Sequence, residues 1–437
     1  MRNAASFPKR WVPAVSCKNA DFLEQRKLGI LFDGDVDHHK ALRLAILPLM
    51  HSEKLALLAP AMNHSTSKLC QLLEKAADAG RTVDIHKMLG SLTLDVISSV
   101  VCGKDMGALD ADLAERHLST ASDYASVFEH FEPVSGGGQV NDAYAAVMMV
   151  TPSALHPLLH LLSKWWPSHG VVILEAADQR VKQESRWLLA EHKKTEAAPD
   201  DDNKVPTLIS TLTSAVLKLK EYPARQLTDN ETLAQMHTFL LAGYETTSSA
   251  LAHTIFFMAR DALVTITALA EVDAFAAAAA GREPTAEDVA SSFSFLTACL
   301  DESLRLRPPG SAMVRECVAP TVVEGFTIPA RTNCIVYLTP IHRDAEYFPD
   351  PLTYMPSRFL DGEQISHRHP NAFSPFGAGP LSCIGGRLAR QEMVLVLAGL
   401  FTKFSFQLEP GQNPLPNREG LTNVPAAGVR VRVLRRY

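Results

Sequence analysis

Apolar positions in the first part of the chain recur every three or four residues, which is the period of a helix packed on one face. This pattern predicts helices over 37–51 and 83–101, and a long amphipathic helix with a charged outer face over 171–194. The acidic, proline-flanked stretch 195–206 breaks the period and is typical of a solvated loop. We therefore expect the first 270 residues to be mainly helical.

The clearest helix begins after residue 228. Thr228 and Glu231 have the spacing of a capping box, and the apolar pattern continues to about Arg260. At ~1.5 Å per residue such a helix is roughly 45–50 Å long, enough to cross a domain. Its second half is apolar nearly all round, which predicts burial. A membrane span over 238–259 is disfavoured, because the stretch contains a glutamate and a histidine.

A pair of prolines at 308–309 ends the last of several further predicted helices near Arg307. After these prolines the helical period of apolar residues is lost. The alanine-rich run 274–280 precedes that helix and is typical of helix or surface linker. Beyond it, 321–340 has β-branched runs punctuated by Gly and Pro, which predicts short strands. The segment 428–436 alternates apolar and basic residues, which we interpret as an edge strand protected by charge. The expected fold is mainly α with small β-sheets, in one domain over 1–437.

Composition narrows the function classes. The 437 residues are 46% hydrophobic and 21% charged, which is ordinary for a soluble globular protein. A net charge of −6 gives no basic bias toward nucleic acid. The seven cysteines are odd in number, widely spaced and without a CxxC pair, so a zinc site and a disulfide framework are both disfavoured. Six of them are expected to be reduced, mostly buried thiols.

The seventh cysteine lies in FSPFGAGPLSCIGGR, residues 373–387, ahead of an apolar helix. Phe376, Gly379, Cys383 and Gly385 fit the spacing F-x-x-G-x-x-x-C-x-G. A thiol just before a helix start is near the positive end of the helix dipole, which favours the thiolate. One thiolate cannot complete a zinc site, but it can be the axial ligand of a haem, and glycines let a flat macrocycle approach. The alternative is a structural turn with a buried free cysteine.

A second group of residues, AGYETT at 242–247, lies within the predicted buried helix. A carboxylate at this place is costly unless it is paired or solvated. Glu245 and Thr246 together are typical of a proton-delivery pair. The preceding Gly243 permits close approach of a ligand or a local widening of the helix. The alternative is a bent helix whose glutamate reaches a nearby base.

A third group is the pair Glu302 and Arg305, three residues apart on one helix face. E-x-x-R alone is a weak signal, since any surface helix produces one. Here the neighbours on the same face are apolar, which predicts a buried ion pair that needs a further partner. Arg358, in FPDPLTYMPSRF, is the natural partner.

These three motifs, in this order, resemble the cytochrome P450 family of haem-thiolate monooxygenases, and the resemblance extends from about residue 29 to the C-terminus. It implies the P450-like fold, with a long central buried helix and a cysteine-ligand loop. It also implies a haem b whose iron is bound by Cys383. The other residues that it implies for cofactor binding are Phe376, Gly377, Gly379, Gly385, His39, Arg43 and Arg315.

The resemblance also assigns roles away from the iron. Glu245 and Thr246 would be the acid–alcohol pair that delivers protons during oxygen activation. Glu302, Arg305 and Arg358 would form a structural triad that stabilises the haem-side core. The substrate side of the haem would be lined by Phe239, Leu241, Ala242, Ala312, Met313 and Val314, with the turn at 424–427 as a further wall.

Two departures from the family pattern are expected to matter. Two residues before the cysteine the family usually has Arg or His, and this chain has Leu381. Losing one charge-assisted contact to a haem propionate costs about 1.5–3 kcal/mol, which predicts weaker haem retention. The propionate-binding helix also begins near residue 37, so the usual membrane anchor, first helix and first strands are expected to be missing.

The expected activity is insertion of one oxygen atom from O2 into an apolar organic substrate. The chain has no flavin module and no G-x-G-x-x-G, so electrons are expected from NADPH through a separate reductase that docks on Arg387, Arg390 and Lys403. A full-length form is expected on the cytosolic face of the endoplasmic reticulum membrane. Two alternatives stay open: a haem-thiolate isomerase or dehydratase of peroxides, which the Glu245–Thr246 pair disfavours, and a non-catalytic or decayed paralogue.

Overall fold

The computed structural model describes residues 9–10, 28–31, 33–110, 183, 185–190, 192–194, 205, 207–218, 224–419 and 422–436. The helix expected over 171–194 and the loop expected over 195–206 lie outside the described residues for most of their length. The other expected elements can be compared with the structure directly.

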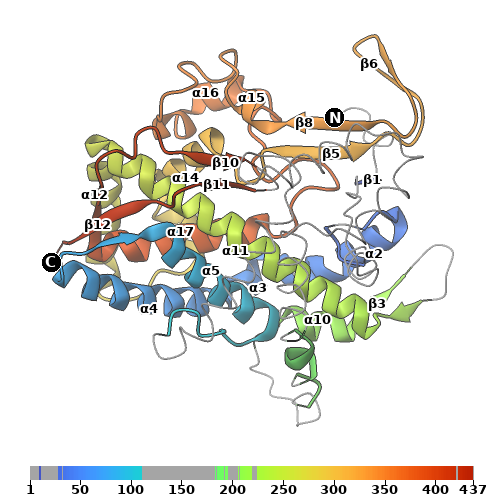
Figure 1. The fold of residues 1–437 in the computed structure, drawn as a ribbon, viewed down its shortest axis with the longest axis horizontal. Coiled ribbons are helices and arrows are strands. Elements are labelled where there is room, and N and C mark those ends of the chain that lie inside the picture. The colour runs from blue at the N-terminus through green and yellow to red at the C-terminus, as the bar shows by residue number, and fades with distance from the viewer. Residues whose placement is uncertain are drawn as a thin grey trace, which may run out of the picture.

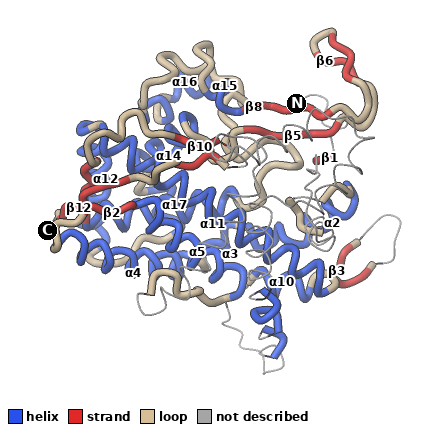
Figure 2. Tube along the Cα trace, viewed as in Figure 1, coloured by secondary structure: helices blue, strands red, loops and turns tan. Residues whose placement is uncertain are grey.

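Helices make up most of the described chain, and strands lie mainly at its edges (Figure 2). The described helices are α2 (Val36–Ile46), α3 (Ser52–Ala56), α4 (Ala59–Asp78), α5 (Ile85–Cys102), α10 (Leu208–Ser214), α11 (Asp229–Arg260), α12 (Ala262–Ala279), α13 (Ala286–Ser291), α14 (Ser294–Leu306), α15 (Leu338–His342), α16 (Gly362–His367) and α17 (Gly386–Lys403). Short 3-10 helices, η2 (Leu47–Met50) and η4 (Pro356–Phe359), follow α2 and precede α16. The mainly-α prediction with small sheets is confirmed.

Helix α11 runs through the middle of the molecule with α5, α14 and α17 against it (Figure 1). It contains 32 residues, and the predicted capping box of Thr228 and Glu231 is present at its start. The predictions of its length and burial are therefore confirmed. A second capping box, of Thr285 and Asp288, begins α13, and the alanine run 274–280 lies largely within α12.

Glycines let α5 and α11 approach closely. A Cβ added at Gly243 would lie 2.6 Å from the Ile97 side chain, and one added at Gly90 would lie 3.2 Å from the Tyr244 ring. The room that a Cβ would need at Gly243 is thus taken by Ile97 of α5, so this glycine serves the packing of the two helices. The expected approach of a ligand or local widening of the helix at Gly243 stays a prediction. Ile97 is 146 positions from Gly243 in the chain, so the sequence around Gly243 gives no indication of this helix–helix contact.

The strands of the described residues form five small antiparallel sheets. Strand β5 (Ala312–Glu316) lies between β1 (Lys9–Arg10) and β8 (Asn333–Tyr337). Four further strands form two-stranded hairpins: β3 (Val216–Leu217) pairs with β4 (Arg225–Gln226), and β6 (Thr321–Val323) pairs with β7 (Phe326–Ile328). Next to α11, β10 (Asn417–Glu419) pairs with β11 (Asn423–Pro425).

The last strand corrects one prediction. Strand β12 (Arg430–Arg435) lies between β2 (Thr82–Asp84) and β9 (Phe404–Leu408), so it is central where an edge strand was expected. Val431 and Val433 are buried, and Arg430 and Arg432, which precede them, are exposed. The alternation of apolar and basic residues therefore reflects one buried and one solvated sheet face, which produces the same pattern as a charge-protected edge.

Two described helices, α5 and α12, are long and apolar enough to cross a membrane by length and composition. For α5, 67% of the apolar window is buried inside the protein, so packing against α11 accounts for its composition. For α12 the buried share is 17%, and Leu263 and Ile266 are exposed. The stretch 238–259 lies within α11 and does not pass the same test.

Candidate functional site

The cysteine loop is held by backbone geometry that glycine supplies. Gly377 and Gly379 have φ of 73° and 77°, in the left-handed region that favours glycine. The backbone N–H of Cys383 donates to the carbonyl of Phe376 at 2.8 Å, which closes the loop. Helix α17 begins three residues later, with Gly385 as its N-cap. The sulfur of Cys383 is therefore exposed at the positive end of a helix dipole.

Cys383 differs from the other described cysteines. Cys70, Cys299 and Cys317 are buried, and Cys102 and Cys334 are partly buried. Burial raises the pKa of Cys70 to about 11 and raises the pKa of Cys299 as well, so both remain thiols at neutral pH. The expectation for these five thiols agrees with the structure, and Cys17 lies outside the described residues.

The aromatic residue of the loop packs against the start of α17. A Cβ added at Gly386 would lie 3.2 Å from the Phe376 ring, so the ring covers the first turn of the helix. The guanidinium of Arg390 stacks over the same ring at 5.7 Å from its centroid. A Cβ added at Gly385 meets nothing within 4 Å, so the space beside this glycine, two residues after the cysteine, is open.

Two of the expected propionate-binding cations are partly buried, and one of them contacts this loop. Arg43, from α2, donates to the carbonyl O of Ser382 at 2.8 Å and to its Oγ at 3.3 Å. Arg315, from β5, donates to the carbonyl O of Val314 at 2.9 Å. Burial lowers the pKa of both guanidinium groups, because loss of water disfavours their charged form.

These features fit a haem. An exposed thiol at a helix start is a suitable axial ligand, and partly buried guanidiniums with only backbone or hydroxyl acceptors are suited to anionic propionates. His39 lies one turn before Arg43 on α2 and is buried. The structure thus brings Arg43 to the cysteine loop, and the expected propionate contact of His39 stays a prediction.

The acid–alcohol pair lies in the middle of α11. Glu245 is 5% exposed, and the Oγ1 of Thr246 donates to the carbonyl O of Ala242 at 2.6 Å. The Oγ1 of Thr422 donates to Oε2 of Glu245. Thr93 of α5 donates to the carbonyl O of Tyr244 at 2.9 Å, which fixes the same turn from the other side. Glu245 is therefore buried and held from the hairpin side, while Thr246 is partly buried and bonded within its own helix.

The three residues of the expected triad are in contact and completely buried. Arg305 donates to both oxygens of Glu302 at 2.7 and 2.8 Å, and Arg358 donates to one of them at 3.0 Å. Backbone carbonyls of His342 and Pro351 accept the remaining hydrogens of Arg305 at 2.9 and 2.7 Å. Helix α14 is thereby attached to η4 and to the chain that leads to the cysteine loop.

The residues expected to line the substrate side lie in two places. Phe239 and Leu241 are buried in the hydrophobic core, and Ala242 is partly buried beside them on α11. Ala312, Met313 and Val314 are exposed or partly buried on β5. Of these, Met313 approaches the cysteine loop: its sulfur lies 3.2 Å from a Cβ placed on Gly377. In the hairpin at 424–427, Val424 is buried and Ala426 is exposed.

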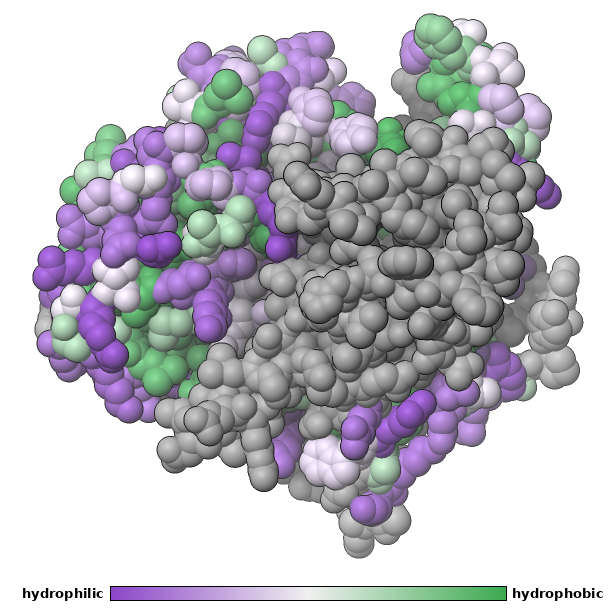
Figure 3. Space-filling view, viewed as in Figure 1, coloured by the Kyte–Doolittle hydropathy of each residue, from purple (hydrophilic) through white to green (hydrophobic). Residues whose placement is uncertain are grey.

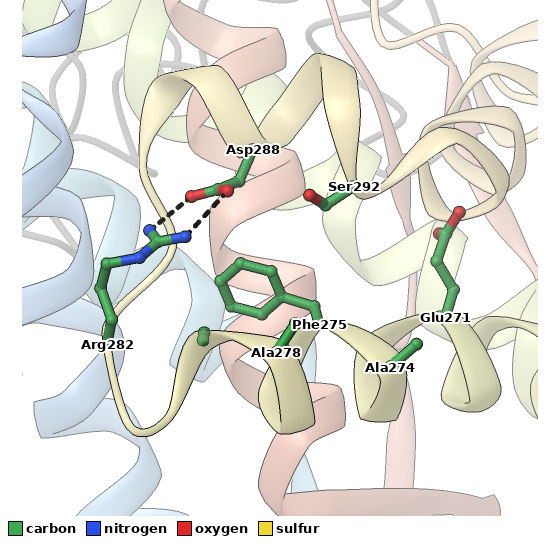
Figure 4. Close-up of a pocket in the computed structure, with 8 residues that line it drawn as sticks. Glu271, Ala274, Phe275, Ala278, Arg282, Asp288 and Ser292 are labelled. Carbon is green, nitrogen blue, oxygen red and sulfur yellow. Dashed lines mark hydrogen bonds and ion pairs between the residues drawn. The ribbon is translucent and has the colours of Figure 1, made fainter.

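A cavity of about 400 Å³ lies elsewhere, between α12 and α13 (Figure 4). Arg282 and Asp288 form an ion pair at 2.7 Å across its rim, and the Phe275 ring lies between that pair and Glu271. Glu271 accepts from backbone N–H groups at the start of α14. None of the motif residues lines this cavity, so we assign it no part in the chemistry.

Sequence reasoning missed two contacts of the site. Thr422 gave no signal, because a threonine in a polar hairpin is ordinary. Ser382 was inside the examined loop, but its role as acceptor for Arg43 depends on a helix 339 residues away. Both contacts follow from tertiary packing alone.

Comparison with known proteins supports the geometry. The family model described as "Cytochrome P450" matches residues 9–429. The chain is 27% identical over 368 residues to "Cytochrome P450 3A2" of Rattus norvegicus, covering 84% of this chain and 68% of that protein. It is 29% identical over 377 residues to "Cyclooctat-9-en-7-ol 5-monooxygenase" of Streptomyces melanosporofaciens, covering 86% and 72%. It is 26% identical over 415 residues to "Thromboxane-A synthase" of Macaca fascicularis, covering 90% and 75%.

Proposed function

The chain belongs to the cytochrome P450 family, and on that premise we propose that it oxygenates an apolar organic substrate with electrons from a separate NADPH-linked reductase. Family membership makes it a haem-dependent oxidoreductase that incorporates oxygen from O2. The observation that carries the proposal is the exposed Cys383 ahead of α17, with Arg43 bonded to Ser382, the residue before it in the loop.

The haem, when bound, supplies the activation of oxygen. In this proposal Cys383 binds the iron, and the helix dipole of α17 stabilises its thiolate. Arg43 and Arg315 bind the propionates. Each guanidinium then donates to a charged carboxylate in place of the neutral acceptors that it has now. Phe376 covers the first turn of α17 and so keeps water from that side of the sulfur.

Protons reach the reaction site through α11. Glu245 is the buried acid, and Thr246 presents a hydroxyl that is oriented by its bond to the carbonyl of Ala242. A hydroxyl both donates and accepts, so it can pass a proton between the acid and the pocket. Glu302, Arg305 and Arg358 take no part in the chemistry: they stabilise the core that carries the cysteine loop.

The reductase would dock beside the cysteine loop. Arg387 is exposed in the first turn of α17, and no ion pair is recorded for it within the described residues. Arg390 and Lys403 are partly neutralised, since Arg390 pairs with Asp301 at 2.6 Å and Lys403 with Glu74 at 3.1 Å. Arg387 is therefore the strongest of the three expected docking cations. An Arg387→Glu variant should slow reduction by the reductase in a salt-dependent way.

We also propose that the chain associates with a membrane surface. The β6–β7 hairpin extends away from the helices, and its apolar atoms lie at the upper right of Figure 3. Phe326 is 76% exposed, and Val322 and Val323 are also exposed. Exposed apolar side chains at the end of an arm suit insertion into the lipid interface.

The proposal is tested by turnover under ¹⁸O2 with NADPH and a reconstituted reductase, on a panel of apolar compounds. Product that carries one ¹⁸O atom and requires both NADPH and reductase is the expected result. Turnover of a fatty-acid hydroperoxide without NADPH or reductase, and with no label from O2, would instead select the isomerase alternative. A Cys383→Ala variant is the control, because it removes the iron ligand and leaves the fold.

A further inference from the structure

One face of α11 is attached to the β10–β11 hairpin by polar side chains. Glu245, Ser249 and His253 are four residues apart, so they lie on the same side of the helix. Each makes a contact with the hairpin segment: Glu245 with Thr422, Ser249 Oγ with the carbonyl of Asn423 at 2.6 Å, and His253 Nε2 with Oδ1 of Asn417 at 3.0 Å. The acid of the proposed proton pair is thus the first of three anchored positions.

This face is neutral and dry apart from the acid. Ser249, His253 and Asn423 are each at most 1% exposed. Burial lowers the pKa of His253 to about 3, so its ring is uncharged. Its Nδ1 lies 2.9 Å from the carbonyl O of Ser249, and its Nε2 faces Oδ1 of Asn417, so the neutral ring donates its single N–H to one of these two acceptors. An uncharged ring at this place adds no charge that would compete for Glu245.

The hairpin is also fixed at its other side. The backbone N–H of Asn423 donates to the carbonyl of Pro309 at 2.8 Å, and its side-chain amide donates to that of Pro308 at 3.3 Å. Thr422, the residue before, is 4% exposed and has its hydroxyl directed at Glu245. Thr246 does not hold the carboxylate, because its own hydroxyl donates to Ala242.

We propose that Thr422 is a positioning residue for Glu245: its hydroxyl holds the carboxylate on the hairpin side of α11, in the orientation from which protons pass to Thr246. The proposal rests on the proposed role of Glu245 in proton delivery. The hairpin that carries Thr422 continues into the expected substrate wall at 424–427. The acid is therefore located by the same segment that borders the substrate side.

The test uses the haem-loaded protein and three Thr variants. Thr422→Val removes the donor at nearly constant volume, and Thr422→Ser keeps a hydroxyl. Thr254→Val is the matched control, because Thr254 is buried on α11 and its hydroxyl donates only to the carbonyl of Ala250, two turns from Glu245. Each is combined with Glu245→Gln in a double-mutant cycle of urea unfolding.

The cycle reports the contact without turnover. Combining Thr422→Val with Glu245→Gln should change the unfolding equilibrium constant by about tenfold or more relative to the product of the single effects, as expected for a hydrogen bond to a charged group. The Thr254→Val cycle should be additive within about twofold. Additivity in both cycles would overturn the proposal.

The second readout is the use of electrons. Thr422→Val should raise peroxide release per NADPH consumed several-fold and raise the solvent deuterium isotope effect on product formation, and Thr422→Ser should restore both. If Glu245→Gln changes peroxide release while Thr422→Val releases no more peroxide than Thr254→Val, Thr422 does not position the acid. The proton-delivery role of Glu245 and Thr246 is then unaffected. If Glu245→Gln leaves peroxide release unchanged, the role of Glu245 in the proposed function falls, and this proposal with it.

Discussion

Replacing Glu302 by Gln should unfold the core that carries the cysteine loop more easily than any surface change. The substitution keeps the size of the side chain and removes its charge, so the guanidiniums of Arg305 and Arg358 stay buried without a counter-ion. Three donor–acceptor pairs of 2.7–3.0 Å lose their charged acceptor, and a fourth, from the backbone N–H of Met355 at 2.8 Å, is weakened.

The magnitude follows from that geometry. A hydrogen bond to a charged group contributes about 1.5–3 kcal/mol, but three that share one carboxylate are not additive. Removing one partner of a buried ion pair costs about 3–5 kcal/mol, and backbone carbonyls around Arg305 and Arg358 can compensate only part of the charge. We therefore expect the free energy of unfolding to fall by about 3–5 kcal/mol.

The assay is urea unfolding followed by far-ultraviolet circular dichroism at fixed haem saturation. The matched control is Glu74→Gln, which breaks the partly exposed ion pair with Lys403 and should cost at most about 1 kcal/mol. Absorbance of the haem should change only through the unfolding transition, since the triad does not touch the cofactor. A loss below about 1 kcal/mol for Glu302→Gln would refute the reasoning.

Two further predictions concern pH and haem retention. The hydrogen bond from Nδ1 of His38 to Asp33, together with the charge of Asp33 and of Glu231, raises the pKa of His38 above 6.5. The protonated His38 ring therefore stabilises the fold fully below pH ~6.5, and this contribution is lost as the pH rises through the raised pKa. The resulting drop in the free energy of unfolding above neutral pH should be absent in His38→Gln. Leu381→Arg should slow haem transfer to apomyoglobin about tenfold or more by adding a propionate partner, and Leu381→Met should not. Equal transfer rates for the two variants would contradict the second prediction.

The helices were predictable because their signals are local. The capping box of Thr228 and Glu231 and the apolar period to Arg260 are all contained in 33 consecutive residues, and α11 begins and ends where they indicate. The same holds for α13 and for the proline pair that ends α14. The start and end of each of these helices depend only on how backbone N–H and C=O groups are satisfied at a helix end and on the burial of one helix face.

Strand position and site contacts were not predictable in this way. The central place of β12 depends on β2, which is more than 340 residues earlier in the chain. The contact of Thr422 with Glu245 joins residues 177 positions apart. Such contacts are decided by how helices and hairpins pack, and a single sequence without packing information contains no period or cap that marks them.

The loop of Cys383 is an intermediate case. Its glycines predicted a constrained turn, and the positive φ at Gly377 and Gly379 accounts for two of them. The loop itself does not indicate which cation approaches it: the family resemblance implied Arg43, and the structure brings Arg43 to Ser382, the residue before the cysteine. The motif specified the ligand, and the tertiary fold specified its surroundings.

The most direct measurement is the absorption spectrum of the reduced, CO-bound protein beside its Cys383→Ala variant. A thiolate from the start of α17 should give the strongly red-shifted Soret band of a haem-thiolate, and the variant should lose it. A histidine-type spectrum in the unaltered protein, or a Cys383→Ala variant that keeps the red-shifted band, would contradict the account.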